Sequence, residues 1–153
     1  MSRTLKCKYK PIHPEKYKGD PRMIEYRSSW ELNFMKWLDD NPNVIKWMSE
    51  ERAIWYYDPV AKKKRRYFPD FIVKYKRRDG VVIEEVVEIK PHKHVTGPNP
   101  NPKRRTKSWV NECLTYATNQ AKWKAATEWA EDRGMNFRLL TEQDVPGWKS
   151  TNK

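Results

Sequence analysis

Two strand-like segments on either side of a tight turn occupy the middle of the sequence. Residues 67–76 and 81–90 are rich in β-branched and aromatic residues, and Arg78-Asp79-Gly80 lies between them. Asp-Gly is typical of hairpin turns, because glycine adopts positive φ without steric cost. The pattern predicts an antiparallel β-hairpin, and the other elements of the fold must pack around it.

The open end of this hairpin carries two carboxylates and a lysine. Asp70 follows Pro69 near the start of the first strand, and Glu88 and Lys90 lie at the end of the second. Residues two apart in a strand share a face and stand roughly 7 Å apart, so Glu88 and Lys90 project together. Asp70 lies near the same end if the strands pair as predicted. The alternative interpretation is a surface hairpin with ordinary cross-strand ion pairs.

Converging carboxylates beside a lysine point to metal-assisted phosphate chemistry. Gathering these charges on one sheet face is unfavourable for structure alone. Carboxylate oxygens suit Mg²⁺ or Mn²⁺, which bind through one or two carboxylates, waters and a phosphate oxygen. Asp70 and Glu88 would hold the metal ion, and Lys90 would orient the attacking water or offset negative charge on the phosphate.

The hairpin is flanked by two predicted helices. The first begins after the N-cap Ser28 and ends at residues 39–42. Its apolar face is formed by Trp30, Phe34, Trp37 and Leu38. The second spans residues 108–133 and ends at Gly134. Its apolar side is formed by Val110, Leu114, Ala117, Ala121 and Ala125.

The remaining segments complete a mixed α/β fold. Short strands are predicted at residues 44–48, 52–57 and 137–140, with a Lys-rich turn at 58–65 and a loop at 91–107. The order α-β-β-β-β-α-β predicts a central mixed sheet flanked by helices, in the α/β (α+β) class, within one domain of residues 27–144. Residues 1–26 are predicted to form a basic N-terminal arm, and residues 145–153 a C-terminal tail.

The charge of the chain favours a polyanionic partner. Its net charge is +12, and a field of that sign attracts nucleic acid first and an anionic membrane surface second. Only 37% of residues are hydrophobic, but eight Trp and eight Tyr argue for an ordered core rather than disorder. No transmembrane span, secretory signal or Gly-rich phosphate loop is evident, so neither a membrane nor a nucleotide cofactor is expected.

Two basic runs lie on either side of the hairpin motifs. They are Lys62, Lys63, Lys64, Arg65 and Arg66, and Lys103, Arg104, Arg105 and Lys107. Either run could be a solvated loop, but their placement favours sequence-independent phosphate contacts.

The histidines and cysteines are less informative. His92 and His94 lack a third soft ligand at suitable spacing, which favours a loop or phosphate contact over zinc. Cys7 and Cys113 are expected to be free thiols.

Three motifs make the chain resemble the PD-(D/E)XK nuclease superfamily. They are Tyr26-Arg27-Ser28-Ser29-Trp30-Glu31, Tyr67-Phe68-Pro69-Asp70-Phe71 and Val87-Glu88-Ile89-Lys90-Pro91. With Asn119-Gln120-Ala121-Lys122-Trp123 and Gly134-Met135-Asn136-Phe137, they are similar to the endonuclease subunit of cut-and-paste bacterial transposons. The small size and Lys16-Tyr17-Lys18-Gly19-Asp20-Pro21 look closer still to the head-completion nucleases of T-even-type tailed phages.

This resemblance implies a restriction-endonuclease-like core and a catalytic set of Glu31, Asp70, Glu88 and Lys90. Glu31 would be a third metal ligand, although it also stands at the N3 position of a capping box with Ser28. Side chains of the long helix would either support the site or form a solvated face; they are Asn119, Gln120 and Lys122. Arg27 would contact DNA or pair with Glu31.

The implied activity is Mg²⁺-dependent cleavage of double-stranded DNA, with Mn²⁺ as a possible substitute, by an endo- or exonucleolytic mode. In a phage setting the enzyme would process packaged DNA in the host cytoplasm during head completion, with portal or neck proteins as partners and a possible place in the virion. The alternatives are a transposon-end or junction-cleaving nuclease of the same fold, and a non-catalytic DNA-binding assembly protein.

Overall fold

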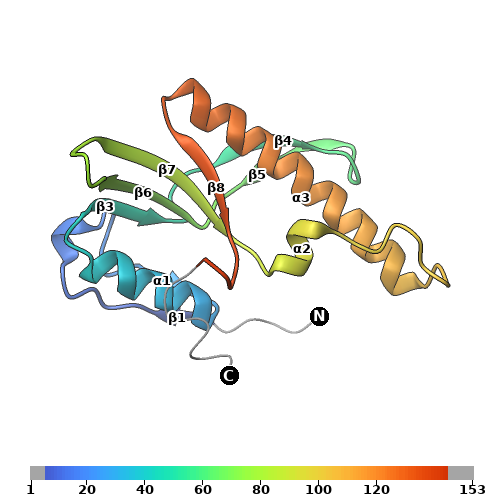
Figure 1. The fold of residues 1–153 in the computed structure, drawn as a ribbon, viewed down its shortest axis with the longest axis horizontal. Coiled ribbons are helices and arrows are strands. Elements are labelled where there is room, and N and C mark those ends of the chain that lie inside the picture. The colour runs from blue at the N-terminus through green and yellow to red at the C-terminus, as the bar shows by residue number, and fades with distance from the viewer. Residues whose placement is uncertain (1–5, 145–153) are drawn as a thin grey trace.

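The computed structural model describes residues 6–144, and Figure 1 shows its arrangement of helices and strands. The predicted C-terminal tail, with Trp148, lies outside the described residues. No helix in the described part of the chain is both long and apolar enough to cross a membrane.

A four-stranded mixed sheet forms the centre of the molecule. Its strands follow the order β3 (Val44–Ser49), β6 (Phe71–Lys76), β7 (Val82–Ile89) and β8 (Asn136–Leu140). The first three are antiparallel neighbours, and β8 runs parallel to β7. This confirms the predicted mixed α/β class with a central mixed sheet.

The predicted β6–β7 hairpin is present. Its turn closes through the backbone N–H of Arg77, which donates to Val81 at 2.9 Å, and Gly80 adopts a φ of 85°. The carboxylate of Asp79 accepts from the N–H of Val81 at 3.0 Å. Turn chemistry therefore fixes the register, in which Phe71 faces Val87.

The prediction of a single strand at residues 67–76 is wrong, because this segment is divided between two strands. Strand β5 (Lys63–Tyr67) ends before Pro69, and β6 begins after Asp70. Proline cannot donate to a sheet ladder, which accounts for the break. Strand β5 pairs with β4 (Ile54–Asp58) in a separate two-stranded sheet. The predicted Lys-rich turn thus shrinks to residues 59–62, because most of its basic residues lie in β5.

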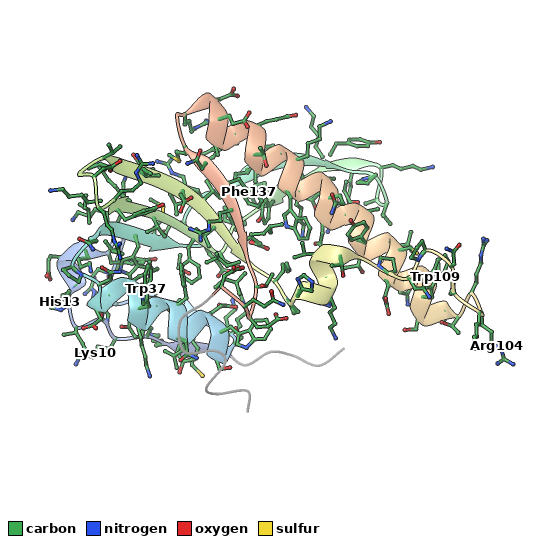
Figure 2. The ribbon with its side chains drawn as sticks, in the orientation of Figure 1. Lys10, His13, Trp37, Arg104, Trp109 and Phe137 are labelled. Atoms are coloured by element: carbon green, nitrogen blue, oxygen red, sulfur yellow. The ribbon has the colours of Figure 1, made fainter. Side chains whose placement is uncertain are left out.

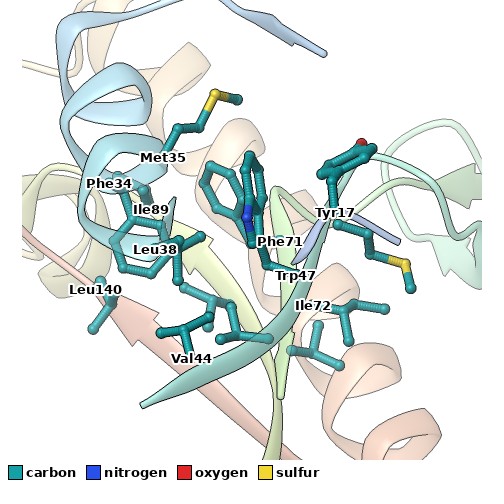
Figure 3. Packing of buried hydrophobic residues seen from close by; sticks show 14 of the residues in the cluster. Tyr17, Phe34, Met35, Leu38, Val44, Trp47, Phe71, Ile72, Ile89 and Leu140 are labelled. Atoms are coloured by element: carbon teal, nitrogen blue, oxygen red, sulfur yellow. The ribbon is translucent and has the colours of Figure 1, made fainter. Parts of the chain in front are cut away.

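Two helices pack on these sheets, α1 (Ser29–Asp40) and α3 (Lys107–Asp132). In α1 the hydroxyl oxygen of Ser28 accepts from the Glu31 N–H at 3.1 Å, which confirms the predicted N-cap. Phe34, Met35 and Leu38 bury their side chains against β3, β6 and β7, as Figure 3 shows for several of these residues. Trp37, predicted for the same face, is 38% exposed.

The prediction of the buried apolar side of α3 is wrong for the first half of the helix. Val110 and Leu114 are exposed, because this half of the helix extends past the sheets. The buried face comprises Asn119, Trp123, Ala126 and Ala130, while Ala121 and Ala125 pack at its edge. The predicted 91–107 loop also contains a short helix, α2 (His92–Thr96).

The N-terminal segment is packed against the domain. Tyr9, Tyr17 and Ile24 are buried in the main core, and the edge of the Tyr17 ring meets Trp47 at a centroid distance of 4.7 Å. Its regular elements are β1 (Cys7–Lys8), which pairs with β2 (Glu25–Tyr26), and a 3-10 turn, η1 (Pro14–Lys16). The segment predicted as an arm therefore contributes directly to the core. Cys7 and Cys113 are free thiols, as predicted.

Candidate active site

Asp70 and Glu88 are held together by reciprocal hydrogen bonds between adjacent strands. Asp70 lies in the break between β5 and β6, and Glu88 lies near the end of β7. The Asp70 N–H donates to Glu88 Oε1 at 3.2 Å, and the Ile89 N–H donates to Asp70 Oδ2 at 2.8 Å. Each carboxylate thus binds the backbone of the other strand, so the two predicted acids meet as the hairpin pattern indicated.

Lys90 completes a compact charged group at the end of β7. Its ammonium Nζ lies 3.7 Å from Glu88 Oε2, and its side chain is 30% exposed. Its backbone N–H donates to the carbonyl of Leu140 at 2.9 Å, which anchors this end of β7 to the neighbouring β8. The ammonium is therefore fixed between a buried carboxylate and solvent.

Burial makes it unfavourable for both carboxylates to be ionised at the same time. Burial raises the pKa of Asp70 well above its usual range, and the charge of Glu88 raises it further. Burial also raises the pKa of Glu88, although Lys90 and the hydroxyl of Tyr67 oppose that shift. A bound cation would relieve this unfavourable charge, and hard oxygen donors of this kind fit Mg²⁺ or Mn²⁺.

Glu31 is engaged at the start of α1. Its own N–H donates to the Ser28 hydroxyl oxygen, as a capping box requires, but its Oε2 accepts from the N–H of Arg27, the residue before the N-cap, at 3.2 Å. Its charge nevertheless contributes to the raised pKa of Asp70. Within residues 6–144, no group of three His, Cys, Asp or Glu side chains is arranged to hold a metal ion. Metal ligation by Glu31 stays a prediction.

Tyr67 is a site residue that the sequence pattern did not reveal. Its hydroxyl donates to Glu88 Oε1 at 2.8 Å. Burial raises the pKa of this hydroxyl and the charge of Glu88 raises it further, so it stays protonated as a donor. The sequence placed Tyr67 at the start of a predicted strand, three residues before Asp70, whereas it ends β5, and its contact with Glu88 depends on how the chain passes from β5 into β6.

Lys122, for which both a supporting role and a solvated helix face were predicted, lies next to Tyr67. Its Nζ lies over the rings of Tyr67 and Tyr56, 5.7 and 5.8 Å from their centroids. Burial lowers the pKa of Lys122, and the charge of Lys90 lowers it further. Its own charge helps to oppose the raised pKa of Glu88. Lys122 thus places a second ammonium on the α3 side of the carboxylates.

A cleft of about 620 Å³ opens between α2, the following loop and α3. The buried side chain of Asn119 contributes to its lining, whereas Gln120 is exposed on another side of the helix. The other polar and aromatic lining residues include Lys93, His94, Lys107, Asn111 and Tyr116. Burial lowers the pKa of His94, and the charges of Lys90 and Lys93 add to the effect. Of the three supporting residues predicted on α3, Asn119 and Lys122 face the interior and Gln120 does not.

The predicted DNA-contacting residues occupy three different settings. Arg27 forms an ion pair with Glu50, while only its backbone meets Glu31. Most of the first basic run lies within β5, whose first four residues are exposed. There Arg65 pairs with the buried Asp58 at 3.4 Å. The second lies on the loop before α3 and ends at Lys107, the first residue of the helix, and Figure 2 shows Arg104 at the tip of this loop. In this loop Arg105 lies over the ring of Trp109, 5.8 Å from its centroid.

Comparison with known proteins gives two consistent matches. Residues 41–142 match the model of a family described as TnsA-like endonuclease N terminal. The chain is 45% identical over 142 residues to the head completion nuclease of Enterobacteria phage T4, covering 90% of this chain and 91% of that protein. No solved structure matches the chain. The family match contains Asp70, Glu88, Lys90 and Lys122, but it begins after Glu31.

Proposed function

This chain belongs to the family of TnsA-like endonuclease N-terminal domains, and on that basis we propose that it is a metal-dependent nuclease that hydrolyses phosphodiester bonds in double-stranded DNA. The observation that carries the proposal is the pair of carboxylates formed by the half-buried Asp70 and the buried Glu88, which are linked to each other and flanked by Lys90. Family membership also implies that the mixed sheet is a restriction-endonuclease-like core.

Asp70 and Glu88 would hold the metal ion, with Glu31 as a third ligand from α1. When bound, Mg²⁺ or Mn²⁺ supplies an acidified water and neutralises charge on the phosphate. The raised pKa values of Asp70 and Glu88 support this assignment, because a bound cation offsets both the cost of desolvating their charges and the repulsion between them.

The side chains around the acids have separate tasks. Lys90 orients the attacking water and offsets the negative charge that builds up on the phosphate oxygens. Tyr67 holds Glu88 in place through its hydroxyl. The half-buried Lys122 adds positive charge from the α3 side. Asn119 lines the adjacent cleft and offers an amide to the DNA backbone.

DNA is held mainly through its phosphates. The net charge of +12, the basic strand β5 and the basic loop before α3 supply sequence-independent contacts. Arg27 contributes less than its position suggests, because Glu50 already neutralises it. Such binding predicts salt-sensitive affinity with little base readout.

The similarity to the head completion nuclease supports a role in phage assembly. The protein would process packaged DNA in the host cytoplasm as heads are completed, in contact with portal or neck proteins, and can remain with the virion. The family description also supports a second candidate, a nuclease that cuts transposon ends or junctions. The phage role is favoured because the identity to the phage protein extends over almost the whole chain.

Cleavage of supercoiled and linear duplex DNA tests the catalytic proposal. Wild type, Asp70→Asn and Lys90→Ala are incubated with Mg²⁺, Mn²⁺ or EDTA, with Lys124→Ala as a control at an exposed position of α3. We expect metal-dependent cleavage by wild type and the control. Both site variants should lose at least about 100-fold in rate while still binding DNA.

The two substrates also separate the modes of cleavage. Nicking or linearisation of supercoiled circles identifies an endonuclease, whereas activity confined to linear DNA identifies an exonuclease. A wild-type protein that binds DNA but cuts neither substrate with any metal contradicts the proposal and favours a DNA-binding assembly protein.

A further inference from the structure

The sheet formed by β4 and β5 has two chemically different faces. Its inner face packs on α3 and contributes Ile54, Tyr56 and Tyr67 to a small core that includes Ala126. Side chains alternate along β4, so Trp55 and Tyr57 point to the opposite, outer face, where they are 64% and 57% exposed. Two large aromatic side chains therefore lie uncovered on a sheet whose other face is well packed.

Strand pairing places a cation opposite each of these aromatic residues. In the antiparallel register Trp55 faces Arg66, and Tyr57 faces Lys64. Residues directly opposite each other in such a pair share a face of the sheet. The outer face thus presents two aromatic–cation pairs side by side, and no carboxylate occupies its described positions.

Phe68 extends this surface toward the catalytic residues. It is 43% exposed, and the Arg66 guanidinium lies 5.9 Å from its ring centroid. Phe68 directly follows β5 and precedes Asp70 by two residues. The aromatic and basic surface, made of Trp55, Tyr57, Lys64, Arg66 and Phe68, therefore adjoins the chain segment that enters the candidate site.

We propose that this aromatic–basic surface binds unpaired bases of single-stranded DNA. Aromatic rings stack on base faces, and neighbouring cations bind the phosphates of the same strand. Bases inside a duplex are already stacked on each other and cannot offer their faces, so the surface selects single strands. The cations, with no acidic residue among them, favour a polyanion over an apolar protein partner. The choice of DNA rests on the proposed function.

Binding in EDTA tests this inference separately from cleavage. Fluorescence anisotropy compares a labelled 15-nucleotide oligo-dT with a 15-base-pair duplex, using wild type, Trp55→Ala, Tyr57→Ala and Trp55→Phe. Trp37→Ala is the matched control, because it removes an exposed Trp from α1. We expect each alanine variant of the surface to bind the single strand roughly 5- to 100-fold more weakly, with duplex affinity changed less than about twofold. Trp55→Phe should retain most of the affinity, and Trp37→Ala all of it.

Salt dependence distinguishes stacking from charge. Trp55→Ala should leave the slope of log K against log salt unchanged, whereas Lys64→Ala should reduce it by about 0.7 for one lost phosphate contact. Unchanged single-strand affinity in both alanine variants would overturn the proposal, as would equal losses on the duplex. The proposal would also be overturned if wild type does not bind single strands and sedimentation shows that it self-associates through Trp55. That result would identify the surface as a protein interface. Cleavage assays do not enter these outcomes, so the nuclease proposal stands or fails independently.

Discussion

At the scale of single residues, the candidate site depends on side chains that restrain one another. Glu88 receives hydrogen bonds from the Tyr67 hydroxyl and the Asp70 N–H, and it lies beside Lys90. Such partners orient a carboxylate and favour its ionised form against the effect of burial, so they govern how well it can hold a cation. The function of Glu88 is therefore tied to Tyr67 as much as to Asp70.

Removal of the Tyr67 hydroxyl should weaken metal binding without abolishing cleavage. In Tyr67→Phe the Glu88 carboxylate loses a 2.8 Å hydrogen bond, so its pKa rises and its position loosens. We expect the Mg²⁺ concentration for half-maximal cleavage to rise about tenfold. Metal titrations of the cleavage rate measure this, with Tyr56→Phe as the control because Tyr56 is the other tyrosine under Lys122. Equal behaviour of the two variants would contradict the assigned role.

At the scale of elements, the N-terminal segment is joined to the end of α1 by a buried carboxylate. Asp39 is 1% exposed and accepts from the Tyr9 hydroxyl at 2.7 Å, the Ile12 N–H at 2.6 Å and the His13 N–H at 2.9 Å. Lys16 Nζ caps the same helix end by donating to three backbone carbonyls, those of Leu38, Asp39 and Asn41. These contacts explain why a basic segment without clear periodicity is ordered.

Loss of the Asp39 carboxylate should destabilise the whole domain. Asp39→Ala leaves three donors without their acceptor, and each unsatisfied buried donor costs about 1–3 kcal/mol. Because two of these donors are only partly buried, we expect a loss of about 3 kcal/mol in the free energy of unfolding, measured with urea. Asp40→Ala, at the exposed neighbouring position, should change it by less than about 0.5 kcal/mol. A similar loss in both variants would refute the role of Asp39.

The pH dependence of this effect has a definite sign. Burial disfavours the charged form of Asp39, but hydrogen bonds from Tyr9, Ile12 and His13 outweigh it and hold the pKa below its usual value. A lowered pKa in the folded state contributes stability above the unfolded value of about 3.9, and that contribution is lost as the pH falls through the folded value. The stability difference between wild type and Asp39→Ala should therefore narrow below about pH 4.

At the scale of the whole molecule, positive charge extends over both ends. Figure 2 shows Lys10 near one end and Arg104 on the loop at the other. The basic loop lies at the far end of α3, beside the cleft that Asn119 and Lys107 line. On the proposed function, we expect charge at this end, beside the cleft, to contact DNA more than charge at the Lys10 end.

Salt titrations of DNA binding should reveal this asymmetry. Each phosphate contact contributes about 0.9 to the slope of log K against log salt for duplex DNA. The double variant Arg104→Ala, Arg105→Ala should lower the slope by about 1.8 if each residue contacts one phosphate. The double variant Lys8→Ala, Lys10→Ala should leave it nearly unchanged. Equal reductions would mean that charge acts only through the net field of the molecule.

Local chemistry in the sequence was enough to predict several elements and the grouping of the central charged residues of the candidate site. Ser28 predicted the start of α1, and Asp79-Gly80 predicted the hairpin turn, because capping and positive φ depend on a few adjacent residues. Alternation along the second strand then predicted that Glu88 and Lys90 lie together, and the hairpin turn predicted Asp70 at the same open end, although Asp70 lies in a break between two strands.

The remaining features depend on which distant element covers a given face. The sequence shows that Val110 and Leu114 are apolar, but α3 extends past the sheets there and leaves them exposed. The contact of Lys122 with Tyr67 exists because β4 and β5 form their own sheet under α3, a pairing that propensity within either strand does not specify. Spacing and turn chemistry are local and can be derived from the chain, whereas burial is settled only when segments far apart in sequence compete for the same surface.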